Sequence, residues 1–209
     1  MTTVELQFPF TGTTLPSDHG YALYGALARI VPELHEASWA AIETVPGIAS
    51  GDGVTYLDPQ SRLKIRLPQE RISLLLRLVG QRIEMDGHAI RLGNPQIKLL
   101  TPSPQLYARI VTIKGFTEPE PFQEAVNRKL QEMAIDGMPS VGPRRVVRVG
   151  DHKIVGFALV IHQLNDDASL LLQESGMGGR RRMGCGIFFP IAIDRVIGQP
   201  PQRVEKVSR

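Results

Sequence analysis

The segment from Gly176 to Gly186 holds the residues best suited to chemistry, because glycines there enclose three consecutive arginines, Arg180, Arg181 and Arg182. Its five glycines are Gly176, Gly178, Gly179, Gly184 and Gly186. A glycine backbone can approach a phosphate closely, and a planar guanidinium group donates paired hydrogen bonds to it. The segment therefore predicts binding of a polyanion, and its place near the C-terminus favours nucleic acid.

The same segment does not fit a nucleotide-binding loop. That signature needs Gly-x-x-x-x-Gly followed by a lysine and a hydroxyl residue. Here Gly184 is followed by Cys185 and Gly186, so both the lysine and the magnesium-binding hydroxyl are missing. The remaining alternative is a flexible hairpin whose arginines are simply solvated, as charged loops often are.

Positive charge is clustered in this chain. The formal net charge of the 209 residues is only +3, and a second basic cluster comprises Arg144, Arg145, Arg148 and Lys153. Aromatic residues make up only 6% of the chain and form no cluster on a predicted strand. We therefore expect arginines to recognise the backbone and shape of an RNA, and base stacking is disfavoured.

Histidine is the side chain best suited to proton transfer near neutral pH. His19 precedes a predicted helix, whose dipole favours the neutral, proton-accepting imidazole, although the residue could merely belong to a turn. His35 follows that helix, where an imidazolium could simply offset the opposite end of the dipole. No two of the five histidines are three or four residues apart, and Cys185 is the only cysteine. We expect neither a metal site nor a cofactor.

The elements that must position these residues follow one order twice. In the first pass, strands are predicted over residues 3–9, 54–57, 62–67, 89–92 and 96–100. One helix begins at a cap over residues 16–18 and ends near Pro32, and a second covers 68–79. The order is read as β-α-β-β-α-β, which is ferredoxin-like.

Two prolines in residues 101–104 predict a linker before the second pass. That pass has strands over 106–113, 144–149, 153–161 and 186–193, and helices over 119–135 and 166–174. We expect an α+β protein with two ferredoxin-like (RRM-like) domains over residues 1–100 and 105–197, and a tail over 198–209. No apolar run approaches the length of a membrane span and no signal pattern begins the sequence, so we expect a cytoplasmic protein.

Three features together resemble a known family. They are the tandem ferredoxin-like order, the loop in which Gly176-Met-Gly178 and basic residues precede Gly184-Cys-Gly-Ile187, and the segment from Asp18 to Leu27 that leads to Leu34-His35-Glu36. The chain resembles the CRISPR-associated protein six family, the repeat-cleaving endoribonucleases of the RAMP superfamily. The segment around His19 is also similar to a small subgroup from subtype I and transposon-associated systems.

The resemblance implies metal-independent cleavage of precursor CRISPR RNA within each repeat. A ribose 2′-OH attacks the adjacent phosphorus, so the site needs a base, an acid and a cation, and the products carry a 2′,3′-cyclic phosphate and a 5′-OH. The match places the catalytic histidine at His35, with His19 as its rival, and a cooperating tyrosine at Tyr21. Residues 38–43 lack the lysine that some members have, so Arg29 or the loop arginines would replace it.

The resemblance also implies partners. Repeat RNA or guide RNA would contact the loop segment and the second basic cluster, and other subunits of a CRISPR effector complex would join them; no membrane is expected. The alternative is a non-catalytic RAMP subunit that holds guide RNA without cutting it.

Overall fold

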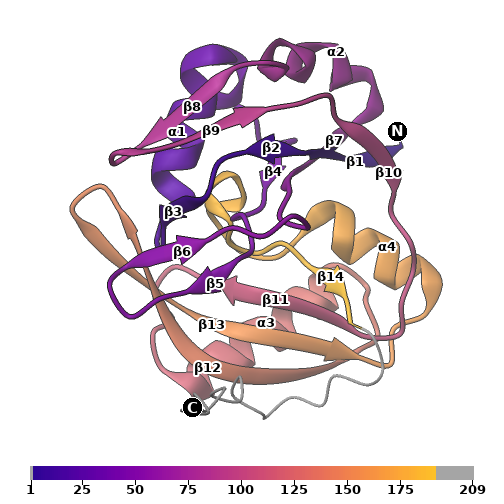
Figure 1. The fold of residues 1–209 in the computed structure, drawn as a ribbon. Coiled ribbons are helices and arrows are strands. Elements are labelled where there is room, and N and C mark those ends of the chain that lie inside the picture. Colours follow the sequence, from indigo (N-terminus) through magenta and orange to yellow (C-terminus); the bar gives the residue numbers. More distant parts are fainter. Residues whose placement is uncertain (1, 192–209) are drawn as a thin grey trace, which may run out of the picture.

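The computed structural model describes residues 2–191 of the chain. Its N-terminal half is built on a four-stranded antiparallel sheet (Figure 1). Its strand order is β10 (Gln96–Leu99), β1 (Thr3–Phe8), β7 (Leu63–Pro68) and β4 (Ala41–Ile42). In chain order these strands are the fourth, first, third and second, which is the ferredoxin-like arrangement. Helix α1 (Gly20–Ile30) connects the first two.

The C-terminal half repeats this plan below the first sheet in Figure 1. Its sheet has the order β12 (Met138–Val149), β13 (His152–His162), β11 (Leu106–Val111) and β14 (Phe189–Pro190), all antiparallel. The helices are α3 (Pro119–Glu132) and α4 (Asp166–Ser175). The predicted α+β fold with tandem ferredoxin-like halves is therefore confirmed.

Two small sheets flank the N-terminal half. One has the order β3 (Thr14–Pro16), β6 (Val54–Tyr56) and β5 (Ile48–Ala49), and the other has β2 (Phe10–Thr11), β9 (His88–Leu92) and β8 (Arg82–Met85). The strand predicted over 54–57 thus exists but is not the second strand of the main sheet. That place belongs to β4, which pairs with β7 through only two residues.

Two further predictions of elements need correction. The helix expected over 68–79 is divided into η2 (Gln69–Arg71), α2 (Ile72–Leu75) and η3 (Leu76–Leu78), because tight 3₁₀ turns replace regular helix at both ends. The strand expected over 186–193 is reduced to β14, since Gly186 has a φ of 65° and packs against Met177. The end of that prediction and the tail over 198–209 lie outside the described residues.

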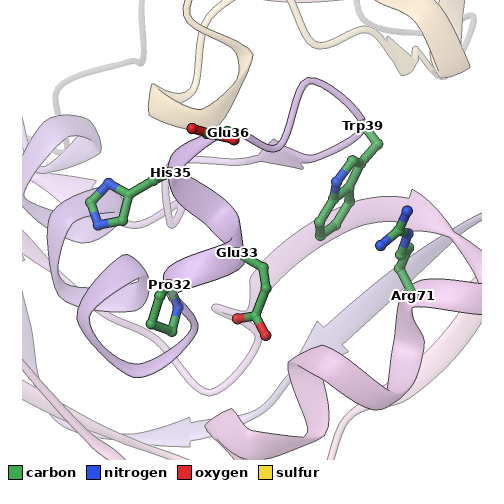
Figure 2. A pocket seen from close by; sticks show the side chains of 6 residues that line it. All are labelled: Pro32, Glu33, His35, Glu36, Trp39 and Arg71. Carbon is green, nitrogen blue, oxygen red and sulfur yellow. The ribbon is translucent and has the colours of Figure 1, made fainter.

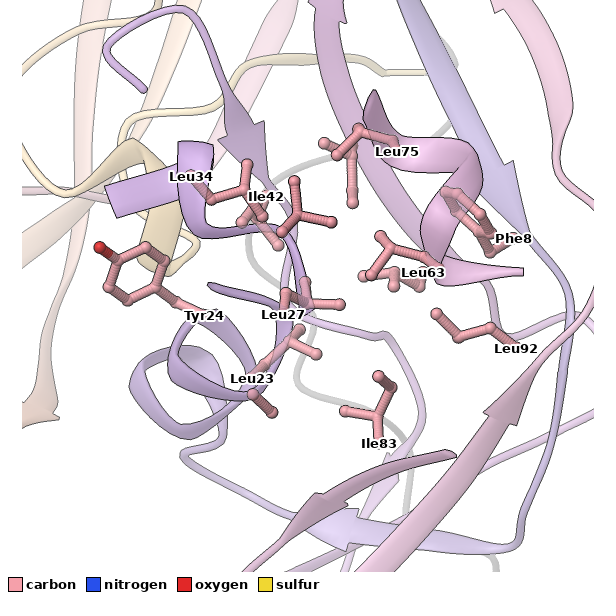
Figure 3. Packing of buried hydrophobic residues seen from close by; sticks show 14 of the residues in the cluster. Phe8, Leu23, Tyr24, Leu27, Leu34, Ile42, Leu63, Leu75, Ile83 and Leu92 are labelled. Atoms are coloured by element: carbon pink, nitrogen blue, oxygen red, sulfur yellow. The ribbon is translucent and has the colours of Figure 1, made fainter. Parts of the chain in front are cut away.

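Each half buries its own apolar core. In the first, Leu23 and Leu27 of α1 face Leu63 and Ile83 (Figure 3). In the second, Phe122 of α3 packs on Phe157 of β13 with ring centroids 4.7 Å apart. Burying such side chains contributes about 1.5–3 kcal/mol each to stability. The cores hold α1 and the strands rigid, so residues at their ends keep fixed positions.

A buried arginine joins the halves. Arg66 of β7 pairs with Glu5 at 3.0 Å and donates hydrogen bonds to the carbonyl oxygens of Gln173 and Phe188 at 3.1 and 2.6 Å. Its guanidinium carbon lies 4.4 Å from the centroid of the Phe189 ring. The end of α4 and the start of β14 are therefore fastened to the first sheet, which places the segment between them, residues 176–188, against the N-terminal half. Among residues 2–191, no helix is long and apolar enough to cross a membrane.

Candidate functional site

The glycines of residues 176–186 allow close packing of backbone on backbone. A Cβ on Gly176 would overlap the Gly186 carbonyl oxygen, and one on Gly186 would overlap that of Met177. A Cβ on Gly184 would overlap the side chain of Thr44, from the other half. Gly176, Gly184 and Gly186 are buried, so these three leave no room for a phosphate, contrary to their predicted direct role. They shape the loop that carries the arginines.

Gly178 and Gly179 differ because both are exposed. The amide of Gly179 donates to the Thr112 carbonyl oxygen at 3.0 Å, and the Thr112 hydroxyl donates to the Gly179 carbonyl oxygen at 3.2 Å. Gly178 has a φ of 78°, a left-handed backbone that favours glycine. This part of the loop lies against Thr112, just after β11, and both glycines are exposed, so contact with an RNA stays a prediction for them.

The three loop arginines have different surroundings. Arg180 is exposed, in a left-handed conformation with a φ of 64°. Arg181 is half-buried and donates to the Glu174 carbonyl oxygen at 2.5 Å, which fastens the loop to the end of α4. Arg182, in η4 (Arg181–Met183), turns toward the N-terminal half. Only Arg180 presents its charge fully to solvent.

Arg182 reaches the end of η1 (Pro32–His35), which follows α1. Its Nη1 donates to the Leu34 carbonyl oxygen at 2.7 Å and to the carbonyl oxygen of His35. Its guanidinium carbon lies 5.2 Å from the Tyr24 ring centroid, a cation–π distance. Two segments about 147 residues apart in the sequence therefore meet at one place.

His35 is exposed at this junction. Its Nδ1 lies 3.4 Å from the hydroxyl oxygen of Tyr24, and the two rings meet edge to face with centroids 6.1 Å apart. Tyr24 is largely buried on α1, at 9% exposure. A buried phenol that contacts one nitrogen can orient the imidazole and leave the other nitrogen facing solvent.

His19 occupies the opposite kind of environment. It is only 2% exposed, its Nδ1 lies 2.7 Å from the Pro16 carbonyl oxygen, and its Nε2 accepts a hydrogen bond from the Val45 amide at 2.9 Å. Burial is the main cause that lowers the pKa of this imidazole. With both nitrogens engaged by the backbone, His19 has none left for a substrate, and we correct its predicted catalytic role to a structural one.

The predicted tyrosine does not contact His35. Tyr21 is 44% exposed on α1, whereas Tyr24, one helical turn later, contacts both His35 and Arg182. Nothing in the sequence distinguished Tyr24 from Tyr21 as the tyrosine that contacts His35. Arg29, a suggested cation, is exposed on the last turn of α1, and among the described residues it makes no hydrogen bond to His35 or Tyr24.

The second basic cluster lies on the hairpin of β12 and β13. Arg144, Arg145, Arg148 and Lys153 are all exposed, and Arg148 and Lys153 face each other across the two strands. The Arg148 amide donates to an Asp18 carboxylate oxygen at 2.6 Å, so the hairpin is held beside the N-terminal end of α1 (Figure 1). The cluster therefore flanks one end of α1 and His35 flanks the other.

Two groups were not singled out by sequence reasoning. Arg109 of β11 is half-buried, and its Nε atom has no hydrogen-bond partner among the described residues.

An open groove of about 360 Å³ lies beside His35, and Figure 2 shows the side chains that line it: Pro32, Glu33, His35, Glu36, Trp39 and Arg71. No spacing pattern marked Trp39 and Arg71, because they come from different segments.

The chain is similar to known proteins in sequence. The family model described as Cas6 Crispr matches residues 4–192. A protein of Myxococcus xanthus (strain DK1622), named CRISPR-associated endonuclease Cas6, is 40% identical over 190 residues, covering 91% of this chain and 82% of that protein.

Two solved structures have a similar fold. One, a CRISPR associated protein Cas6, has a TM-score of 0.65 at 14% identity, over 91% of this chain and 99% of its own. Another is Thermus thermophilus Cse3 bound to an RNA representing a pre-cleavage complex, with a TM-score of 0.53 at 14% identity, over 90% of this chain and 98% of its own. With the family model matching nearly the whole chain, this protein belongs to the Cas6 family of CRISPR-associated proteins.

Proposed function

We propose that this chain is an endoribonuclease that binds CRISPR repeat RNA and cleaves precursor CRISPR RNA into guide RNAs. The observation that carries the proposal is the meeting of Arg182, Tyr24 and His35, since it joins the arginine-bearing loop to an exposed histidine. The Cas6 endonuclease from Myxococcus xanthus, 40% identical over most of both chains, supports the same activity.

The proposed reaction is a transfer of phosphorus from one ribose oxygen to another. A base takes the proton of the 2′-OH, the 2′-oxygen bonds to the adjacent phosphorus, and the bond to the 5′-oxygen breaks. An acid protonates that leaving oxygen, which leaves a 2′,3′-cyclic phosphate and a 5′-OH. His35 makes one of the two proton transfers through its solvent-facing nitrogen, and no step needs a metal ion.

Arg182 supplies positive charge in this site. Its Nη1 is engaged by the two carbonyl oxygens of η1, but a guanidinium has five N–H donors in all. Among residues 2–191, Nε and Nη2 of Arg182 make no hydrogen bond, so their donors remain for a phosphate oxygen, whose charge increases in the transition state. Arg182 thus takes the place of the lysine that is missing from residues 38–43.

Exposed cations would hold the rest of the RNA. Arg180, on the loop, and Arg144, Arg145, Arg148 and Lys153, on the β12–β13 hairpin, are proposed to contact phosphates. Such contacts also suit retention of the product within a complex with other CRISPR-associated subunits.

Cleavage of repeat RNA in EDTA tests the proposal. We expect full cutting without divalent metal, and no cutting when the nucleotide before the cleaved bond carries a single 2′-deoxy substitution. Cutting of the deoxy RNA would overturn the mechanism. Tight binding of the repeat without any cutting of the all-ribose RNA would instead favour the non-catalytic RAMP subunit.

A further inference from the structure

The groove beside His35 has the chemistry of a nucleobase site. We infer that it binds the base of a nucleotide next to the phosphate on which His35 acts, an inference that rests on the proposed function. Trp39 is the only tryptophan of the chain. In Figure 2 it lies between Glu33 and Arg71, and it is partly buried against the N-terminal core.

The groove offers flat surfaces for stacking. The guanidinium carbon of Arg71 lies 5.6 Å from the centroid of the Trp39 ring. An indole and a guanidinium are both planar, and both stack on the face of any base. Arg71 already lies against the ring of Trp39, but its side chain is exposed and comes from a different segment, so it can move aside to let a base stack on Trp39 and then lie on the other face of that base. Few other aromatic residues could serve, since they make up 6% of the chain.

The charges in the groove favour a base over the RNA backbone. Glu33 and Glu36 both line it, and carboxylates repel a phosphate. Glu33 is oriented by a 2.6 Å ion pair with Arg77, a contact that also lowers the pKa of the carboxyl and keeps it charged. A carboxylate accepts hydrogen bonds only, so it would accept them from an amino group of cytosine, adenine or guanine. Uracil has no such group and is the least suited base.

The position of the groove specifies which nucleotide enters it. His35 and Trp39 line the same cavity, and they are separated by only three residues of the chain. A phosphate held at His35 therefore lies beside the groove, and the base of a neighbouring nucleotide can reach it. Stacking there would fix the ribose relative to the histidine, which is the kind of positioning that raises the rate of cleavage.

Tryptophan emission provides a direct test, because Trp39 is the only indole. The probe is the cognate repeat RNA with a 2′-deoxy substitution that blocks cutting, and a set of the same RNAs with one abasic site each near the cut. We expect the intact RNA to change the emission and a single abasic position beside the cut to abolish that change. Fluorescence anisotropy of labelled RNA reports binding separately.

The variants Trp39→Ala and Trp39→Phe extend the test as a double-mutant cycle. Trp39→Ala should weaken binding of the intact RNA about tenfold, and it should not further weaken binding of the RNA that lacks the critical base. Trp39→Phe should recover most of the affinity. Arg71→Ala should act in the same direction, whereas Arg82→Ala, at an exposed arginine on β8, serves as the matched control.

Each outcome decides between distinct accounts. The groove assignment would be overturned if Trp39→Ala weakened binding of the intact and abasic RNAs equally. It would also be overturned if the intact RNA bound without changing the emission of Trp39, or if no abasic position affected that change. The proposed nuclease activity would stand in either case. Absence of repeat binding by the wild type in the anisotropy assay would overturn the proposed function and this inference with it.

Discussion

One histidine lies directly before α1 and another lies in η1, which follows it, and their surroundings are opposite. At the N-terminal end, His19 is buried with both ring nitrogens bonded to backbone groups. At the C-terminal end, His35 is exposed, with Tyr24 at one nitrogen and Arg182 holding its backbone. A histidine can transfer protons to a substrate only where one nitrogen is left open, so we propose a structural role for His19 and proton transfer for His35.

Replacement of the exposed histidine should have the largest effect. We expect His35→Ala to reduce single-turnover cleavage of repeat RNA by about 10²–10⁴-fold, because a proton-transfer group is lost. The thermal midpoint and the affinity for RNA should stay close to wild type, since the side chain is exposed. Near-normal cleavage by a folded His35→Ala protein would contradict the catalytic role of His35.

Arg182→Ala tests whether the loop positions the histidine. Loss of its bonds to the carbonyl oxygens of Leu34 and His35 frees η1, and we expect cleavage to fall about 10²-fold. Arg182→Lys should restore little, because an ammonium cannot reproduce the planar fork. Arg180→Ala is the control, expected to weaken salt-dependent binding and to leave the rate at saturating protein unchanged. An equal loss of rate in both alanine variants would contradict the assignment.

His19→Ala should affect stability. The Val45 amide would lose its partner, which costs about 1–3 kcal/mol in the free energy of unfolding. Because burial lowers the pKa of His19, the unfolded chain binds the proton more readily below pH 6.5, and the wild type should lose stability as pH falls through that value. Urea unfolding at pH 7.5 and 5.5 should show a smaller decrease in the free energy of unfolding for the variant than for the wild type. Lost cleavage in a variant that is still folded would return His19 to the active site.

The tyrosines should give the smallest difference. Tyr24→Phe removes the hydroxyl 3.4 Å from His35, and we expect cleavage to fall about fivefold, near 1 kcal/mol for one hydrogen bond. Tyr21→Phe should be silent, since that side chain points to solvent at 44% exposure. Rates for the two variants, measured side by side, would reverse this assignment if Tyr21→Phe were the slower one.

Local patterns in the sequence were sufficient for much of the fold. Periodic apolar residues indicated α1, α3, α4 and the long strands, since each carries enough residues to show its period. They missed β4, because two buried residues, Ala41 and Ile42, show no alternation and their place follows from pairing with β7. The second strand of the main sheet was predicted at residues 54–57, which instead contribute to a separate small sheet.

The site was only partly predictable for a similar reason. The loop arginines stood out by their clustering among glycines and His35 by the family motif, but the direction of each arginine depends on packing between the halves. Tyr21 and Tyr24 lie one helical turn apart, so spacing alone could not say which faces η1. The low aromatic content argued against stacking, yet it gave no indication that Trp39 and Arg71 meet beside His35.

Chemical rescue with imidazole would show whether His35 transfers a proton during cleavage. The His35→Ala protein would be mixed with repeat RNA in EDTA, and cleavage followed as imidazole is added to the solution. Since His35 is exposed, a free imidazole can enter the space left by its ring. The account predicts that cutting recovers with imidazole concentration, at the wild-type position and with a 2′,3′-cyclic phosphate, while Arg182→Ala is not rescued. A His35→Ala protein that binds the repeat normally and shows no recovery would contradict it.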